Sequence, residues 1–304
     1  MIEQEIEFRS GDFKIVGTVA LPSLKESYPG VLLIPGSGQV DRNENVKKIH
    51  INVFKEIACF LADNNVATLR YDKRGVGESE GNFWEAGFHD NASDALAALV
   101  YFKNYKGIQY DKVFLLGHSE GALISTKLAG DGVDVVGIIL LAGAAQKGED
   151  ILKWQAQQVV KGLKGINSWL ITLFHIDVAK AQQKQIDKIK SSNKDWYRVQ
   201  LIAKINAKWM REFLAYNPED DLPKIKVPIL AITGSKDIQV NPEDLRKMAE
   251  LVNTDFEYHE LPDVTHILRI EKGPPSISTY KQQATRPMDF GILTIILDWL
   301  KKRV

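Results

Sequence analysis

Five short, nearly continuous apolar segments restrict the folds that this chain can adopt. They are GVLLIPGSG from Gly30, VATLRYD from Val66, KVFLLGHS from Lys112, VVGIILLAG from Val135 and VPILAITGS from Val227. Strands of this kind are typical of a parallel sheet that is covered on both faces. Apolar residues at helical spacing lie between them, at 49–61 and 95–102. Strands that alternate with helices predict a doubly wound α/β fold.

The two ends of the chain are expected to complete this sheet. The alternating stretches QEIEFRS and FKIVGTVALP predict an opening antiparallel hairpin that turns at Ser10 and Gly11. A last strand from Asp255 to Leu261 and a last helix from Asp289 to Lys302 follow the fifth apolar segment. Between them, EKGPPSISTYKQQATRP is interpreted as a long surface loop.

Residues 146–221 interrupt the alternation, because they contain helical, polar and aromatic sequence and no convincing strand. A strand of the same sheet is expected before and after them. We therefore interpret residues 146–221 as an inserted helical cap (lid) on a core domain that comprises 1–145 and 222–304. The aromatic residues of this segment are Trp154, Trp169, Trp196, Trp209 and Tyr216.

The composition argues against several kinds of partner. Lys and Arg number 39 and Asp and Glu number 39, so no net charge is available to hold a nucleic acid or an anionic membrane surface. A single cysteine, Cys59 in the apolar run IACFL, excludes cysteine-based zinc spacing and is expected to be buried. No apolar run approaches the ~18 residues of a membrane span. The acidic N-terminus does not read as a secretion signal, so a cytoplasmic location is expected.

The motif GHSEG, residues 117–121, is a candidate for a catalytic serine. G-x-S-x-G is a weak signal alone, but here it directly follows a buried strand and precedes a helical pattern. That placement is typical of a nucleophile elbow, in which a strained backbone exposes the serine hydroxyl. The alternative is that Ser119 simply caps the following helix.

A serine nucleophile needs a base and an acid that orients the base. His266, in LPDVTHIL, follows the last predicted strand. It is the expected base, because in folds with a nucleophile elbow the catalytic residues occur along the chain in the order serine, acid, histidine. Asp237, after the strand VPILAITG, is the expected acid, with Asp263 as its rival. His118 is expected to point away from Ser119. The other histidines lack a comparable position: His50, His89, His175 and His259.

Donors for an oxyanion are expected in two places. The loop PGSGQVDR follows the first parallel strand, and the backbone N–H of Ser37 is the favoured donor, with Gly38 and Gln39 as alternatives. The second donor is the N–H of Glu120. PGSG lacks the GK[ST] ending of a phosphate-binding loop. Chemistry of this kind requires no metal and no organic cofactor.

Together these motifs resemble the α/β-hydrolase superfamily, and in particular bacterial serine esterases of its lysophospholipase and proline-aminopeptidase-like branch. The resemblance rests on PGSGQVDR, YDKRGVGES, GHSEG, GSKD and His266. It implies a carboxylesterase (EC 3.1.1) for small or medium acyl esters, and structural roles for Asp72 and Arg74 beside the elbow. Two departures are Pro35, where the common first loop has histidine, and a longer segment after His266.

The expected reaction is attack of Ser119 on an ester carbonyl while His266 takes its proton. A histidine base must be neutral and free histidine titrates near ~6.5, so activity is expected to fall in acid. Aromatic residues are expected to supply apolar surface over the site, although for any single one of them a place in the core of the cap is the more expected alternative. These residues are Phe83, Trp84, Trp154 and Trp209.

Three other functions stay open at this point. An aminopeptidase-type serine peptidase needs carboxylates that bind a substrate amine, and Glu219, Asp220 and Asp221 are candidates. An acyl thioesterase uses the same catalytic groups. A catalytically inactive hydrolase fold that serves as a small-ligand receptor is the alternative from a different class.

Overall fold

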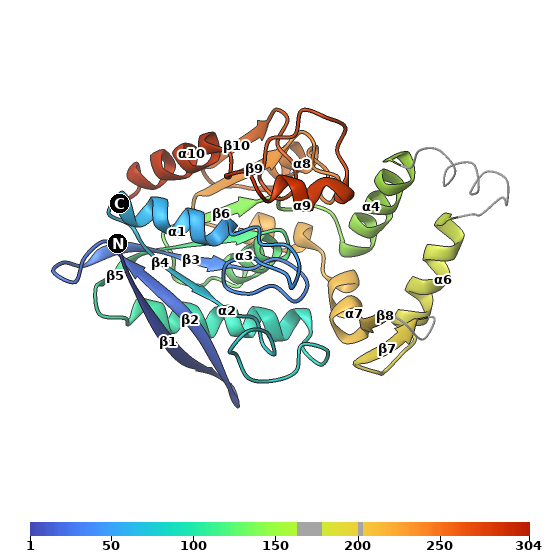
Figure 1. Cartoon of the computed structure of the whole chain (residues 1–304), viewed down its shortest axis with the longest axis horizontal. Coiled ribbons are helices and arrows are strands. Elements are labelled where there is room, and N and C mark those ends of the chain that lie inside the picture. Colours follow the sequence, from blue (N-terminus) through green and yellow to red (C-terminus); the bar gives the residue numbers. More distant parts are fainter. Residues whose placement is uncertain (163–177, 200–202) are drawn as a thin grey trace.

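The computed structural model describes residues 1–162, 178–199 and 203–304 of the chain. Within these residues, one mixed sheet has the strand order β1-β2-β4-β3-β5-β6-β9-β10 (Figure 1). Its strands are β1 (Ile2–Ser10), β2 (Phe13–Leu21), β3 (Tyr28–Ile34), β4 (Ala67–Tyr71), β5 (Ile108–His118), β6 (Ile138–Leu141), β9 (Ile229–Gly234) and β10 (Phe256–Leu261). The mostly parallel α/β sheet predicted from the sequence is confirmed.

All five apolar segments form parallel strands of this sheet. β3 pairs with β4 and β5, and β6 joins β5 to β9. The predicted opening hairpin is β1 and β2, which are antiparallel with Ser10 opposite Phe13. β2 then pairs antiparallel with β4, and β10 extends the other edge in parallel with β9.

Helices cover both faces of the sheet. The helices are α1 (Val53–Asp63) and α10 (Phe290–Lys301) on one face, and α2 (Phe88–Lys103), α3 (Glu120–Gly130) and α8 (Asp244–Leu251) on the other. In β5, Phe114 and Leu116 pack with the first group and Leu115 packs with the second. Successive strand side chains point to opposite faces. A sheet with helices on both faces therefore needs the continuous apolar runs seen in the sequence.

The described elements between residues 146 and 221 lie beside the sheet (Figure 1). They include α4 (Gly148–Gly162), α6 (Val178–Lys190), β7 (Trp196–Val199), β8 (Ala203–Asn206) and α7 (Ala207–Ala215). The expectation that this segment has no strand is wrong, because β7 and β8 form an antiparallel pair with Trp196 opposite Asn206. The β7 sequence WYRV is rich in residues that favour strands, but four residues are too few for a clear alternation. Trp169 and His175 lie outside the described residues.

Three local expectations also need correction. α1 begins at Val53 rather than near Ile49, because Asn52 has a left-handed backbone with φ of 55° and Ile49 pairs with Val46. Cys59 is only partly buried, because it falls between the buried positions of α1. The expected surface loop at 271–287 contains a 3-10 turn (Ile277–Thr279) and the short helix α9 (Tyr280–Gln283).

A search of the described residues finds no helix with the length and apolar character needed to cross a membrane. The same residues contain no group of three or more histidine, cysteine or carboxylate side chains arranged to hold a metal ion.

Candidate active site

Ser119 lies at the turn between β5 and α3, at the carboxyl edge of the sheet. Its φ is 55° and its ψ is −114°, a conformation that L-residues rarely adopt and that costs ~1–3 kcal/mol. Its N–H donates to Leu141 O at 2.9 Å, which ties the turn to the end of β6. The side chain forms no capping hydrogen bond to α3 and is partly exposed. Ser119 is therefore not a side-chain cap of this helix.

Two glycines allow the turn to be this tight. A Cβ on Gly121 would lie 1.9 Å from Ile34 O, and a Cβ on Gly117 would lie 2.0 Å from Gly121 O. Both distances are far inside van der Waals contact, and both partners are backbone atoms. The first turn of α3 consequently packs directly on the ends of β3 and β5, which leaves the Ser119 side chain as the projecting group.

His266 and Asp237 are brought together from the loops that follow β10 and β9. His266 Nδ1 lies 2.8 Å from Asp237 Oδ2, and both side chains are almost completely buried. The other carboxylate oxygen, Oδ1, accepts from the N–H groups of Gln239 at 2.7 Å and Val240 at 2.9 Å. The rival Asp263 pairs with Lys236 instead, at 2.7 Å. Asp237 is thus the carboxylate that orients the imidazole.

No hydrogen bond between Ser119 and the His266 ring is found in the part of the chain that the structure describes. Catalytic hydrogen bonds are often long in unliganded enzymes and shorten in the substrate complex. The two residues are nevertheless linked, because His118, which precedes the serine, contacts the backbone of His266. His118 Nε2 lies 2.9 Å from His266 O, and the two imidazole centroids are 5.0 Å apart.

The candidate oxyanion donors lie beside Ser119. Ser37 and Glu120 line the same cavity as the serine. Neither of their backbone N–H groups donates a hydrogen bond to any of the described residues. Gly38, with φ of +93°, and Gln39 continue the same exposed loop but do not line this cavity. Two unpaired N–H groups next to a hydroxyl suit a developing oxyanion.

The cavity above Ser119 has a volume of about 90 Å³. Trp209 and Phe213, from α7, form one wall as a stacked pair with ring centroids 4.8 Å apart. The other apolar lining residues, none of which was singled out in the sequence, are Leu123, Ala144, Ile151, Leu152 and Val240. Polar residues share the lining with these apolar ones: Ser37, Ser119, Glu120, Gln155 and Gln239.

Of the four aromatic residues expected at the pocket, only Trp209 lines this cavity. Phe83 and Trp84 pack edge to face with each other, at 5.2 Å between ring centroids. Both contact β8: Phe83 O accepts from Asn206, and Lys204 sits over the Trp84 ring. Trp154 is a partly buried residue of α4.

A buried ion pair beneath the site escaped the sequence analysis. Lys73 Nζ lies 2.8 Å from Glu120 Oε2 and also donates to Gly36 O at 3.0 Å. Glu120 Oε1 accepts from Asn91 at 2.8 Å and from Trp209 Nε1 at 2.7 Å. Every oxygen of the Glu120 carboxylate is therefore occupied, as a buried charge requires.

A second buried pair, His118 with Glu44, was also missed. His118 Nδ1 lies 2.5 Å from Glu44 Oε2, and both side chains are about 95% buried. Burial by itself lowers the pKa of His118, but the charge and hydrogen bond of Glu44 together with the His266 carbonyl raise it above its usual value. The two residues are 74 positions apart, and no spacing in the sequence signals such a contact.

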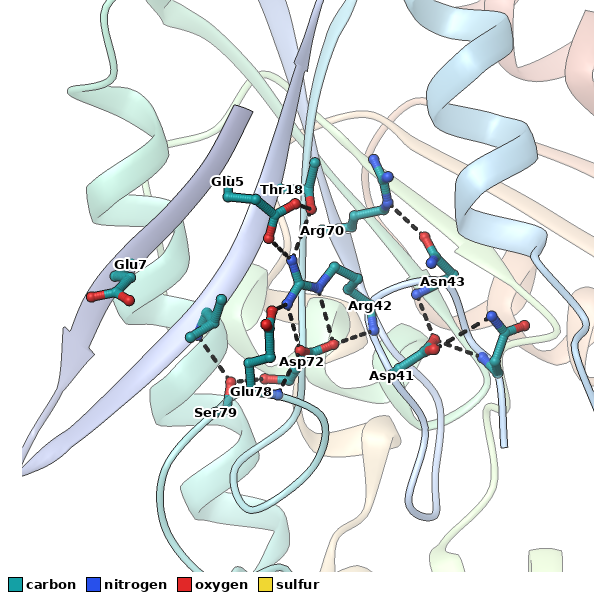
Figure 2. A network of polar contacts seen from close by, with 12 residues as sticks. Glu5, Glu7, Thr18, Asp41, Arg42, Asn43, Arg70, Asp72, Glu78 and Ser79 are labelled. Carbon is teal, nitrogen blue, oxygen red and sulfur yellow. Dashed lines mark hydrogen bonds and ion pairs between the residues drawn. The ribbon is translucent and has the colours of Figure 1, made fainter. Parts of the chain in front are cut away.

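Arg42 anchors the loop that carries Ser37, as Figure 2 shows. Its Nη2 and Nε atoms bind the two oxygens of Asp72 at 2.7 Å and 3.1 Å, and its backbone N–H binds Asp72 at 2.8 Å. Thr18, Glu78 and Glu5 take the remaining donors. Burial disfavours the charged guanidinium, but Asp72 and Glu5 outweigh it and raise the pKa of Arg42. Arg42 and Asp72 thus lock the loops after β3 and β4 together.

The sheet order, the turn at Ser119 and the placement of His266 define an α/β hydrolase. A family model described as "Serine aminopeptidase, S33" matches residues 48–273. The chain belongs to this family.

Similar proteins include esterases and a peptidase. Esterase EstD of Thermotoga maritima is 23% identical over 290 residues, which cover 94% of this chain and 65% of that protein. The chain thus spans about 65% of the length of this relative. A structure of Est1E from Butyrivibrio proteoclasticus with ferulic acid superposes with a TM-score of 0.65 at 19% identity, covering 98% of this chain and 96% of that one. Proline iminopeptidase of Mycobacterium smegmatis gives 0.62 at 16% identity, covering 99% and 98%.

Proposed function

We propose that this protein is a serine hydrolase that cleaves carboxylic esters with short acyl chains through an acyl-enzyme. Ser119 is the nucleophile, His266 the base and Asp237 the group that orients the base. The observation that carries the proposal is the buried 2.8 Å contact between His266 and Asp237 at the same sheet edge as the strained Ser119. The similarity to the relative named Esterase EstD supports the proposal further.

The proposed reaction has two halves. Ser119 Oγ forms a bond to the ester carbonyl carbon as His266 takes the hydroxyl proton, and the N–H groups of Ser37 and Glu120 bind the resulting oxyanion. The intermediate collapses when the carbon–oxygen bond to the alcohol breaks, and His266 gives its proton to the departing alkoxide. Water then attacks the acyl-enzyme by the same route and releases the acid and free serine.

The size of the cavity favours a short acyl chain. Its volume is about 90 Å³, whereas a cavity of ~150 Å³ is known to accommodate benzene. The apolar residues of the lining suit an alkyl group, and the small space favours a short one. Trp209 and Phe213 close the cavity on the side of residues 146–221, which we propose form a cap over the site.

The charges around the cavity favour an ester over a peptide with a free amine. Glu120 is the carboxylate among the cavity-lining residues, and Lys73, Asn91 and Trp209 already occupy its oxygens. The carboxylates expected to bind an amine are engaged elsewhere. Glu219 pairs with Lys247, Asp221 pairs with Lys224, and Asp220 accepts from Asn217. Among the described residues that line the cavity, an α-amino group would find no unoccupied carboxylate.

The experiment compares rates on p-nitrophenyl acetate, butyrate, octanoate and dodecanoate with rates on Pro-p-nitroanilide and butyryl-CoA. We expect the highest kcat/KM on acetate or butyrate and at least tenfold less on dodecanoate. A fluorophosphonate probe is expected to label the wild-type protein and to leave the S119A variant unlabelled. Dominant turnover of the anilide or of the thioester would reject the ester assignment. Absence of labelling would favour an inactive ligand receptor.

A further inference from the structure

The His118 side chain lies between the two loops that the proposed reaction needs. It is the last residue of β5, and both ring nitrogens face acceptors, Glu44 Oε2 at 2.5 Å and His266 O at 2.9 Å. A backbone carbonyl only accepts, so Nε2 must carry a proton. His118 thus donates to the backbone of the very residue whose ring Asp237 holds from the other side.

Glu44 connects this histidine to the oxyanion loop. Its Oε1 atom accepts from the N–H of Gly36 at 2.6 Å, directly before Ser37. Glu44 itself has φ of 66°, a costly conformation for a residue with a side chain. Strain of this kind persists only where the surroundings impose it. One carboxylate therefore binds both the loop of the oxyanion donors and the histidine behind the base.

We infer that Glu44 and His118 form a positioning pair that fixes the spacing between His266 and the Ser37 loop around Ser119, an inference that rests on the proposed function. Neither residue lines the cavity, so neither touches the substrate. Their effect passes through Gly36 N and His266 O. A shift of about 1 Å in either loop is enough to lower a rate ~100-fold.

Stability alone is a weak reason to bury such a pair. Removing two charged groups from water costs several kcal/mol, and apolar residues of similar size are often as stabilising. The pair joins segments 74 and 148 residues apart in sequence, the Glu44 loop to β5 and β5 to the His266 loop. Together with the bond to Gly36, these contacts link the Ser37 loop, the turn at Ser119 and the His266 loop, which must be aligned for acyl transfer.

The hydrogen bonds suggest variants that separate geometry from charge. In E44Q, the amide oxygen still accepts from Gly36 and the amide N–H₂ donates to Nδ1 of a neutral His118, so all three hydrogen bonds survive. In E44A, the links to Gly36 and His118 are both lost. In H118N, the amide nitrogen reaches the place of Nδ1, and only the bond to His266 O is lost.

The test measures kcat and KM on p-nitrophenyl acetate, the rate of fluorophosphonate labelling and Tm for these variants. We expect E44Q to stay within about threefold of wild type. E44A and H118N are expected to lose about 10- to 100-fold in kcat and in labelling rate, with KM within twofold. H259F is the matched control, since His259 pairs with Glu257 at 3.0 Å on β10 away from the cavity, and it is expected to keep wild-type rates.

The outcomes separate this inference from the proposed function. Unchanged kcat in H118N, or equal losses in E44Q and E44A, would overturn the positioning role even if wild type is active and S119A is not. An inactive wild type would overturn the proposed function instead. If H118N does not fold, the comparison of E44Q with E44A decides, because both variants remove the charge and only E44A also removes the hydrogen bonds to Gly36 and His118.

Discussion

Trp209 Nε1 donates a 2.7 Å hydrogen bond to Glu120 Oε1. Trp209 belongs to α7 in residues 146–221, whereas Glu120 directly follows Ser119 on α3. Helix α7 is therefore held by the residue whose N–H is a candidate oxyanion donor. Lys73 binds the other oxygen of the same carboxylate. The cavity-lining Trp209 and the buried Lys73 are therefore both held by Glu120.

Replacing Trp209 with phenylalanine removes this donor and keeps an aromatic ring against Phe213. We expect W209F to lower kcat/KM about three- to tenfold, mainly through KM, and to lower stability by ~1 kcal/mol, the net value of a typical hydrogen bond. Steady-state kinetics and thermal unfolding check this. W299F is the control for the kinetics, because Trp299 is buried in α10 away from the cavity and its indole N–H has no partner among the described residues. An equal loss of kcat/KM in both variants would contradict the role of the hydrogen bond.

An amide has nearly the shape of the Asp237 carboxylate but lacks its charge, and we expect activity to depend on the charge. D237N presents an amide to His266 Nδ1 and favours the tautomer that cannot accept the serine proton, so we expect kcat to fall ~10³- to 10⁴-fold. D263N is the matched control on the neighbouring loop, where Asp263 pairs with Lys236, and should keep kcat within about twofold. A larger loss in D263N than in D237N would reverse the assignment of the acid.

The packing of the elbow predicts a large effect of one methyl group. G121A would place Cβ 1.9 Å from Ile34 O, so β3 and α3 must move apart. We expect a loss of about 3 kcal/mol in stability, the upper end of the usual range for overpacking, together with loss of labelling by a fluorophosphonate. In G273A the nearest described atom is a flexible side-chain oxygen at 3.2 Å, and its Tm should stay near that of wild type.

Asp244 predicts a pH dependence of stability. Burial, opposed by hydrogen bonds from Gln146 and Ala145, raises its pKa from 3.8 to about 6. The folded protein therefore binds this proton more tightly than the unfolded chain, and the contribution of Asp244 to stability rises as the pH falls through about 6. Between pH 7.5 and 5, the stability of wild type relative to D244N should increase by ~1–2 kcal/mol. Denaturant unfolding of both proteins measures this, and a constant difference would exclude it.

The contacts of Arg42 with Asp72 in Figure 2 predict that lysine is a poor substitute at this position. Lysine cannot bind both oxygens of Asp72 as the Nε and Nη2 atoms of Arg42 do. We expect R42K to cost ~2–3 kcal/mol, the range for hydrogen bonds between charged groups. R9K, at an exposed arginine that binds Asp12 O, should change unfolding by less than ~0.5 kcal/mol. A stable R42K protein would mean that the loops after β3 and β4 are held by other contacts.

Much of the fold follows from periodicity, because strands covered on both faces must be apolar throughout. The positions of Ser119, Asp237 and His266 also follow, since each comes after a predicted strand and the carboxyl ends of parallel strands meet at one edge. The placements of Lys73 and Glu44 do not follow. Their partners lie 47 and 74 residues away, and a charged residue in a loop looks the same in sequence whether it is buried or solvated.

The aromatic residues illustrate the same limit. Trp84 and Trp209 are equally plausible pocket residues in sequence, but Trp84 packs beneath Lys204 and Trp209 reaches Glu120. The difference depends on how β7 and β8 place the segment 146–221, and strands of four residues each carry too little pattern to be predicted.

The cavity is assembled from two sources with unequal freedom to change. Five lining residues come from α4 and α7, within residues 146–221: Ile151, Leu152, Gln155, Trp209 and Phe213. Ser119 and the other lining residues come from loops and helix ends at the edge of the sheet, where Asp237 and His266 also lie. Evolution can therefore exchange the walls while the reacting groups keep their places. Descendants of one ancestral enzyme would diverge first in which acids they release, and a laboratory graft of this segment between relatives should transfer that preference.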